Sequence, residues 1–173
     1  MILRIATIGL VAALMTGCAG EVKREGNLAA PAKLSVQKYK QVTVSLNDQA
    51  QTELSDNVQF DPDRLRDTIT RVMKAKGMIA DNAADKLDIK ITDIRVRSNF
   101  SAIMFGFMAG SDHVTGTVKP LDESDKPLET FEVSASYALG GLGGGQNDAR
   151  MSWLYDKFAE LTVKELTGQT QKQ

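Results

Sequence analysis

The sequence predicts a single α+β domain built from an antiparallel or mixed sheet of about four strands with two helices on one face, in the order β-α-β-β-β-α. Two amphipathic helical segments lie near the two ends of the domain, which is expected over residues 39–168. Most of the alternating, strand-like runs are clustered between these helices, and the chain has no internal repeat. This grouping favours an antiparallel or mixed sheet over a regular series of parallel β-α-β units.

The first strand and the first helix have the clearest local signals. Apolar and polar residues alternate over residues 39–46, as they do in a half-buried strand. Asp61 and Pro62 then offer an N-cap and a proline at the first helical position. Apolar residues follow at helical spacing, and Gly77 supplies the stop; the apolar residues are Leu65, Ile69, Val72 and Met73.

Three further strands and a final helix complete the predicted domain. A long strand is expected over residues 87–96, where the alternation slips at Thr92 and Asp93 and predicts a β-bulge. Strands are also expected over residues 113–121 and 128–139, joined by a polar turn. The last helix is expected from about Asn147 to Thr167, with an apolar stripe formed by Met151, Leu154, Phe158 and Leu161.

The N-terminus has the pattern of a secretory signal. Arg4 precedes an apolar run that is too short to span a bilayer, and small residues then precede Cys18, the only cysteine in the chain. Residues 14–18 resemble the lipobox of bacterial lipoproteins, with Met15 where leucine is usual. The resemblance implies that residues 1–17 are a cleaved signal peptide and that Cys18 is acylated. The alternative is a thiol that follows an uncleaved helix.

The same resemblance implies a location. Acyl chains on Cys18 would hold the protein stably in a membrane. In the enterobacterial sorting pattern an aspartate after the cysteine retains a lipoprotein in the inner membrane, and Ala19 therefore implies the periplasmic face of the outer membrane. Residues 18–38 are polar, lack periodicity and contain Pro31, so they are expected to form a flexible tether, and residues 169–173 a disordered tail.

Composition excludes several classes of function. The formal net charge is −1, and Arg4 is the only charged residue that cleavage of the signal would remove. No basic surface for nucleic acid is therefore expected. One cysteine forms no intrachain disulfide and no multi-thiolate zinc site. The acidic groups near Asp61 and Asp122 are explained by helix capping and turn formation, and we expect no metal and no cofactor.

The pattern resembles one family across nearly the whole mature chain. The lipobox, the first strand and capped helix, the segment from Gly106 to Leu128, and the glycine-rich loop before the last helix resemble bacterial envelope lipoproteins of domain of unknown function 4410. In that family a glycine usually occupies the turn where this chain has Asp125 and Lys126. The resemblance implies an envelope context and brings no catalytic residue with it.

Two segments are candidates for binding. The first is a glycine-rich loop directly before a helix start, which either binds an anion through free N–H groups or is only a flexible connector; its candidate residues are Gly140, Gly141, Gly143, Gly144, Gly145 and Asn147. The second is the uncharged run from Phe100 to Gly110, which is either buried core or an exposed apolar surface for a partner. Its candidate contact residues are Phe105, Phe107 and Met108.

Catalysis is not expected from this sequence. Ser111, Asp112 and His113 have the side chains of a hydrolase triad, but consecutive residues of a strand point to opposite faces and do not converge. The leading hypothesis is a non-enzymatic, periplasm-facing outer-membrane lipoprotein that contacts an envelope protein during assembly, transport or surface biogenesis. The alternative is a lipoprotein that binds a small anionic ligand at the glycine-rich loop.

Overall fold

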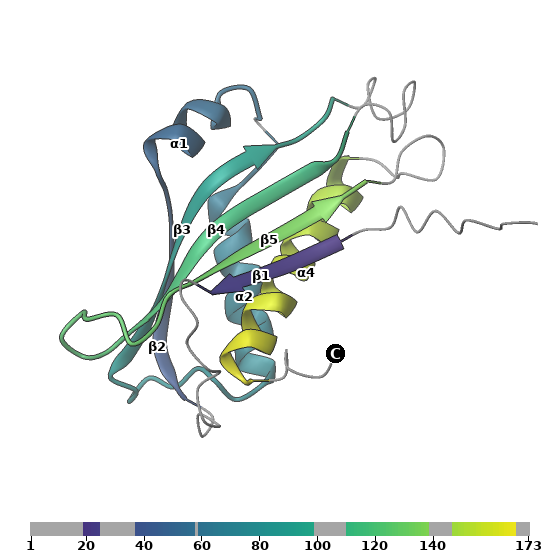
Figure 1. Ribbon diagram of the computed structural model, residues 1–173. Coiled ribbons are helices and arrows are strands. Elements are labelled where there is room, and N and C mark those ends of the chain that lie inside the picture. The colour runs from purple at the N-terminus through teal and green to yellow at the C-terminus, as the bar shows by residue number, and fades with distance from the viewer. Residues whose placement is uncertain (1–18, 25–36, 58, 99–109, 139–146, 169–173) are drawn as a thin grey trace, which may run out of the picture.

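A computed structural model describes residues 19–24, 37–57, 59–98, 110–138 and 147–168. The described chain is α+β, with a five-stranded mixed sheet in the order β1-β5-β4-β3-β2 (Figure 1). Its strands are β1 (Ala19–Arg24), β2 (Tyr39–Leu46), β3 (Asp85–Arg95), β4 (Asp112–Leu121) and β5 (Phe131–Tyr137). Strands β2 and β3 pair in parallel, and the other neighbours are antiparallel.

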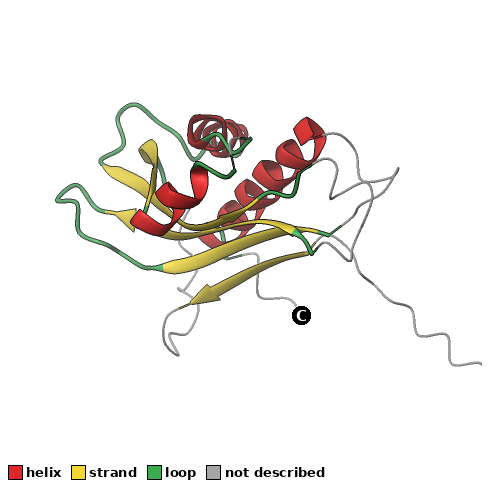
Figure 2. Cartoon of the chain, turned by 90° about the horizontal axis from the view of Figure 1, so that it is seen from above, coloured by secondary structure: helices red, strands yellow, loops and turns green. Residues whose placement is uncertain are grey.

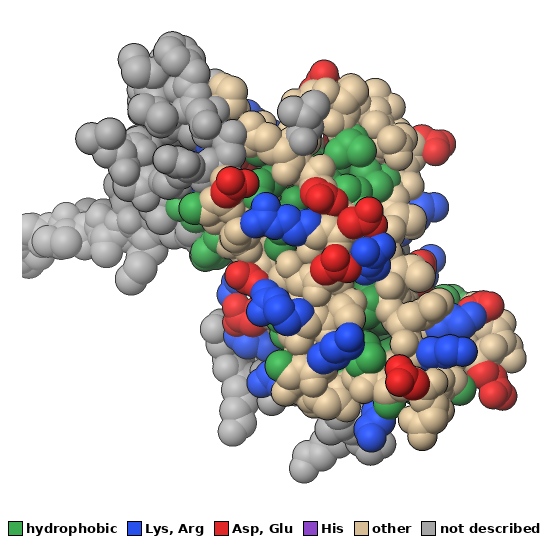
Figure 3. All heavy atoms as spheres, turned by 180° about the vertical axis from the view of Figure 1, so that it is seen from behind, with side chains coloured by type: hydrophobic (Ala, Val, Ile, Leu, Met, Phe, Trp, Pro, Cys, Tyr) green, Lys and Arg blue, Asp and Glu red, His purple; other side chains and the backbone are tan. Residues whose placement is uncertain are grey.

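Two long helices cover one face of the sheet. Helices α2 (Pro62–Ala75) and α4 (Asn147–Leu166) lie side by side on that face, while the short helix α1 (Asp48–Leu54) packs at the ends of β2 and β3 (Figures 1 and 2). Over the helices, acidic and basic side chains are interspersed (Figure 3), and ion pairs such as Arg71 to Asp156, at 2.8 Å, join α2 to α4. No helix of the described residues is long and apolar enough to cross a membrane.

The predicted α+β class is confirmed, and two elements were missed. Helix α1 has only Ala50 buried, so it carries no apolar stripe that would mark a helix in the sequence. Strand β1 lies inside the segment that was expected to be a tether, and that expectation is wrong for residues 19–24. These residues pair antiparallel with β5, from Ala19 opposite Ser136 to Arg24 opposite Phe131.

Local signals in the sequence determine several details of the fold. The Asp61 carboxylate accepts hydrogen bonds from the N–H groups of Asp63 and Arg64 at the start of α2, and Gly77 has the positive φ expected after its end. The predicted bulge is confirmed, because the register of β3 against β4 shifts between Ile91 and Asp93. Capping and bulge formation depend on residues near one another in the chain, so sequence reasoning finds them.

The core lies between the sheet and the two long helices. Inward residues of β4 and β5 pack against α4, and Gly116 in β4 lets Phe158 approach closely. Tyr39 at the start of β2 is buried as well, and this burial is the largest of the effects that raise the pKa of its phenol. Loss of close packing here is costly because neighbouring side chains fill a vacated space only partly.

Candidate functional site

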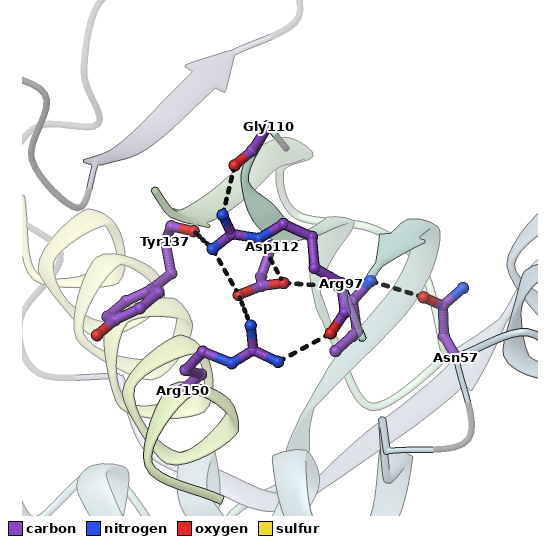
Figure 4. A network of polar contacts seen from close by, with 7 residues as sticks. Asn57, Arg97, Gly110, Asp112, Tyr137 and Arg150 are labelled. Carbon is purple, nitrogen blue, oxygen red and sulfur yellow. Dashed lines mark hydrogen bonds and ion pairs between the residues drawn. The ribbon is translucent and has the colours of Figure 1, made fainter. Parts of the chain in front are cut away.

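A buried carboxylate lies between two guanidinium groups at one end of the sheet (Figure 4). Asp112 begins β4 and is fully buried, while Arg97 and Arg150 are 5% and 1% exposed. The backbone N–H and Nε of Arg97 donate to Asp112 Oδ1 at 2.7 and 3.2 Å, and Arg97 Nη2 donates to Oδ2 at 3.1 Å. Arg150 Nη1 lies 3.3 Å from the same Oδ2. We call these three residues the arginine–aspartate network.

The arginine–aspartate network also binds backbone carbonyls from separate elements. Arg97 donates through Nη1 to the Gly110 carbonyl at 2.7 Å and through Nη2 to the Tyr137 carbonyl at 3.2 Å. Arg150 Nη2 donates to the Arg97 carbonyl at 2.8 Å, and Asn57 Oδ1 accepts the neighbouring Val96 N–H at 2.6 Å. The end of β3, the start of β4, the end of β5 and the first turns of α4 are therefore held together (Figure 4).

The physical effect of this arrangement is rigidity. Buried charges are tolerated only when they are paired and hydrogen-bonded, and a satisfied buried network specifies one arrangement of the groups around it. Ser98 and Gly110 flank residues 99–109, while Ala138 and Asn147 flank residues 139–146. The network thus fixes the ends of both segments that the sequence singles out for binding.

Most of the sequence-predicted site residues lie outside the described residues. These are Cys18, Phe105, Phe107, Met108, Gly140, Gly141, Gly143, Gly144 and Gly145. Asn147 is the first residue of α4, as predicted. The structure brings the flanks of the two candidate segments to the same end of the sheet, although the segments are separate in the sequence.

Ser111, Asp112 and His113 do not form one catalytic group. Asp112 faces the helices, where it pairs with Arg97 and Arg150, whereas the side chain of His113 is partly exposed and pairs with Asp93 at 2.5 Å. The two side chains point to opposite faces of the sheet, as the strand geometry predicts. The acidic turn is also structural, since Asp122 Oδ1 accepts the N–H groups of Ser124 and Lys126 at 2.9 and 3.0 Å.

Sequence reasoning did not identify Arg97, Asp112 and Arg150 as a set. A signal was present at two positions, because Asp112 has the inward parity of β4 and Arg150 lies one helical turn before Leu154 of the apolar stripe of α4. A charged residue at an inward position points to a buried partner. The partner itself is found only when β3, β4 and α4 are brought together in three dimensions.

The fold and the network define a small, single-sheet α+β domain of an established sequence family. The family described as Domain of unknown function (DUF4410) matches residues 21–141, and the chain belongs to this family. A comparison with curated proteins gives no match.

Three solved structures are similar at low sequence identity. The PelC dodecamer from Paraburkholderia phytofirmans is 15% identical over 86% of this chain and 98% of that chain, with a TM-score of 0.47. A protein from Xanthomonas campestris assigned to DUF330 is 12% identical over 77% and 85%, with a TM-score of 0.44. A minor lipoprotein from Acinetobacter baumannii is 12% identical over 76% and 94%, with a TM-score of 0.36.

Proposed function

We propose that this protein is a lipid-anchored, non-enzymatic interaction module on the periplasmic face of the outer membrane. It takes part in envelope assembly, transport or surface biogenesis by binding another envelope protein. The anchor is the acylated Cys18, and the contact is made by the apolar run around Phe105, Phe107 and Met108. The observation that carries the proposal is that the arginine–aspartate network fixes the two flanks of this run, from Arg97 to the carbonyl of Gly110.

Rigid flanks on the apolar run favour recognition over catalysis. Both oxygens of Asp112 are engaged by guanidinium groups, so this buried carboxylate acts as a structural counter-ion. Fixing the flanks of a binding segment lowers the conformational entropy lost when a partner binds, which improves affinity without adding contacts. An uncharged run of this composition, presented from fixed flanks, suits an apolar groove on a partner protein.

The test is capture of a partner from mildly solubilised envelopes with acylated protein. We expect a specific envelope protein to copurify with the wild type and to be lost with Phe105→Asp. The matched control is Leu128→Asp, because Leu128 is a large apolar residue, 51% exposed, in the turn between β4 and β5. Loss of the partner with both variants, or no specific partner with the wild type, would refute the proposed contact.

The anchor has its own test. Mass spectrometry of the N-terminal peptide is expected to show a diacylglyceryl-modified and N-acylated Cys18, and density fractionation to place the protein with outer-membrane markers. Cys18→Ser should remain unacylated and leave that fraction. An unmodified Cys18 in membranes that acylate other lipoproteins would contradict the proposed anchor.

A further inference from the structure

We infer that the end of the sheet where β1 begins lies directly against lipid headgroups, with Tyr137 and Trp153 at the membrane interface. The inference rests on the proposed acylation of Cys18 and goes beyond it, since it gives the domain an orientation and a lipid-facing surface. Gly110 lies at the same end of the sheet as the start of β1, so the envelope protein of the proposed function is then one that lies in or at the same membrane.

No flexible spacer separates the acylated residue from the sheet. Cys18 is bonded to Ala19, which is already the first residue of β1 and pairs with Ser136. Consecutive Cα atoms are about 3.8 Å apart, whereas a flexible tether of about 20 residues would allow roughly 25 Å. The end of β5 therefore stands within a residue or two of the acyl attachment point.

Strand β1 is attached at both of its ends. At the start of the strand, Gly20 lies so close to α4 that an added Cβ would collide with Leu161 Cδ1 and would be 3.1 Å from Lys157 Cε. At the other end, Arg24 Nη1 donates to Glu129 Oε2 at 3.0 Å and Arg24 Nε donates to Glu165 Oε1. These contacts oppose the peeling of β1 away from the sheet, so the anchor and the domain move as one body.

The same contacts show which part of α4 lies level with the anchor. Gly20 lies beneath Lys157 and Leu161, and Arg24 contacts Glu165, so β1 and α4 run in the same direction (Figure 1). Ala19, the first residue of β1, lies one residue before Gly20, about 3.3 Å back along the strand. One turn back along α4, from Lys157 to Trp153, covers about 6 Å. Trp153 therefore lies about 3 Å beyond the level of Ala19, the residue that is bonded to Cys18.

The side chains at this level suit a lipid interface. The rings of Tyr137 and Trp153 pack together with centroids 5.3 Å apart, and both side chains are only partly buried. Tryptophan and tyrosine are enriched at membrane interfaces, where an apolar ring and a polar group are both accommodated. The headgroup layer is about 5–8 Å thick on each side of a bilayer, so an anchored residue and a ring pair near its level can both lie within this layer.

Trp153 is the only tryptophan in the sequence, so the tryptophan fluorescence of the protein reports the depth of this one residue in the membrane. Acylated protein is reconstituted in vesicles of phosphatidylethanolamine and phosphatidylglycerol that contain a lipid with a nitroxide on its headgroup. We expect strong quenching of Trp153 fluorescence. A flexible Gly-Ser insert of about 20 residues between Cys18 and Ala19 should remove most of the quenching, because it lets the domain stand roughly 25 Å away.

A reporter at the opposite end of the sheet is the matched control. Trp153→Phe combined with Leu128→Trp moves the fluorophore to the turn between β4 and β5, where quenching should be weak. Quenching at both positions, at neither position, or unchanged by the insert would overturn the inference. Mass spectrometry of the same vesicles distinguishes the two proposals: if Cys18 is acylated but Trp153 is unquenched, only the orientation fails, and an unmodified Cys18 refutes the anchor itself.

Discussion

Replacement of Asp112 by alanine should be among the most damaging single changes in the domain. Asp112→Ala leaves the guanidinium groups of Arg97 and Arg150 buried without this carboxylate, and it removes the acceptor of the Arg97 N–H. Removing one partner of a buried ion pair costs about 3–5 kcal/mol. For a domain of this size, each kcal/mol lowers the melting temperature by about 2–4 °C, so we expect a decrease of about 10 °C. Asp112→Asn keeps the shape of the side chain and one acceptor oxygen, so its free energy of unfolding should decrease less than that of Asp112→Ala.

The assays are thermal and urea denaturation of the acylated protein in detergent micelles, both followed by the fluorescence of Trp153. The control is Asp156→Ala, which breaks the 2.8 Å pair with Arg71 between two side chains that are more than half exposed. Exposed pairs contribute about 0–1 kcal/mol, so this variant should resemble the wild type. A loss below about 1 kcal/mol for Asp112→Ala would refute the reasoning that the buried network holds this end of the sheet together.

Three further predictions concern β1, the core and alkaline pH. Gly20→Val should release β1 from α4, because its Cβ would collide with Leu161, and amide hydrogen exchange across residues 19–24 should become faster. Gly116→Val should lower the free energy of unfolding by about 1–3 kcal/mol in urea titrations, because its Cβ would crowd the Phe158 ring, 3.3 Å away. Because the folded-state pKa of Tyr39 is raised, chiefly by burial, its neutral phenol contributes stability below the unfolded pKa of about 10, and this stability is lost as the pH rises further.

Each of these predictions has a control on a neighbouring or matched side chain. Glu21→Gln changes an exposed side chain of β1 and should leave amide hydrogen exchange across residues 19–24 unchanged. If exchange in Gly20→Val were as slow as in the wild type, the packing of β1 against α4 would be contradicted. Thr117→Val faces away from the helices and should cost little beside Gly116→Val. The urea midpoint should fall less steeply above pH about 10 in Tyr39→Phe than in the wild type, and identical slopes would count against the effect of Tyr39.

Sequence reasoning succeeded where a signal lies within a few neighbouring residues. The Asp61 cap, the Gly77 stop and the bulge beside Thr92 all follow from local backbone chemistry. The sequence did not predict β1, because its six residues include a glycine and three charged side chains and have no β pattern of their own. Val22 is recognised as a strand residue only when Val133 of β5 lies opposite it.

The candidate site shows the same limit. The apolar run and the glycine-rich loop attract attention in the sequence because their composition is unusual. Nothing in the sequence connects Arg97 with Arg150, which are distant in the chain and meet at one carboxylate in the fold. The energy of a buried ion pair depends on geometry and desolvation, and neither is encoded by spacing along the chain.

The sequence by itself determined the α+β class, the capped helix α2, the order of β2, β3, β4 and β5 along the chain and membership of the DUF4410 family. These properties follow from hydrophobic periodicity, from helix caps and from the family pattern, which can all be read along the chain without knowledge of its fold. Only the tertiary structure decided that residues 19–24 join the sheet, that two buried arginines share Asp112, and that Trp153 of α4 lies near the start of β1. Each of these depends on which distant segments pack together, because edge pairing, burial of charge and depth are relations between surfaces that meet only in the folded chain.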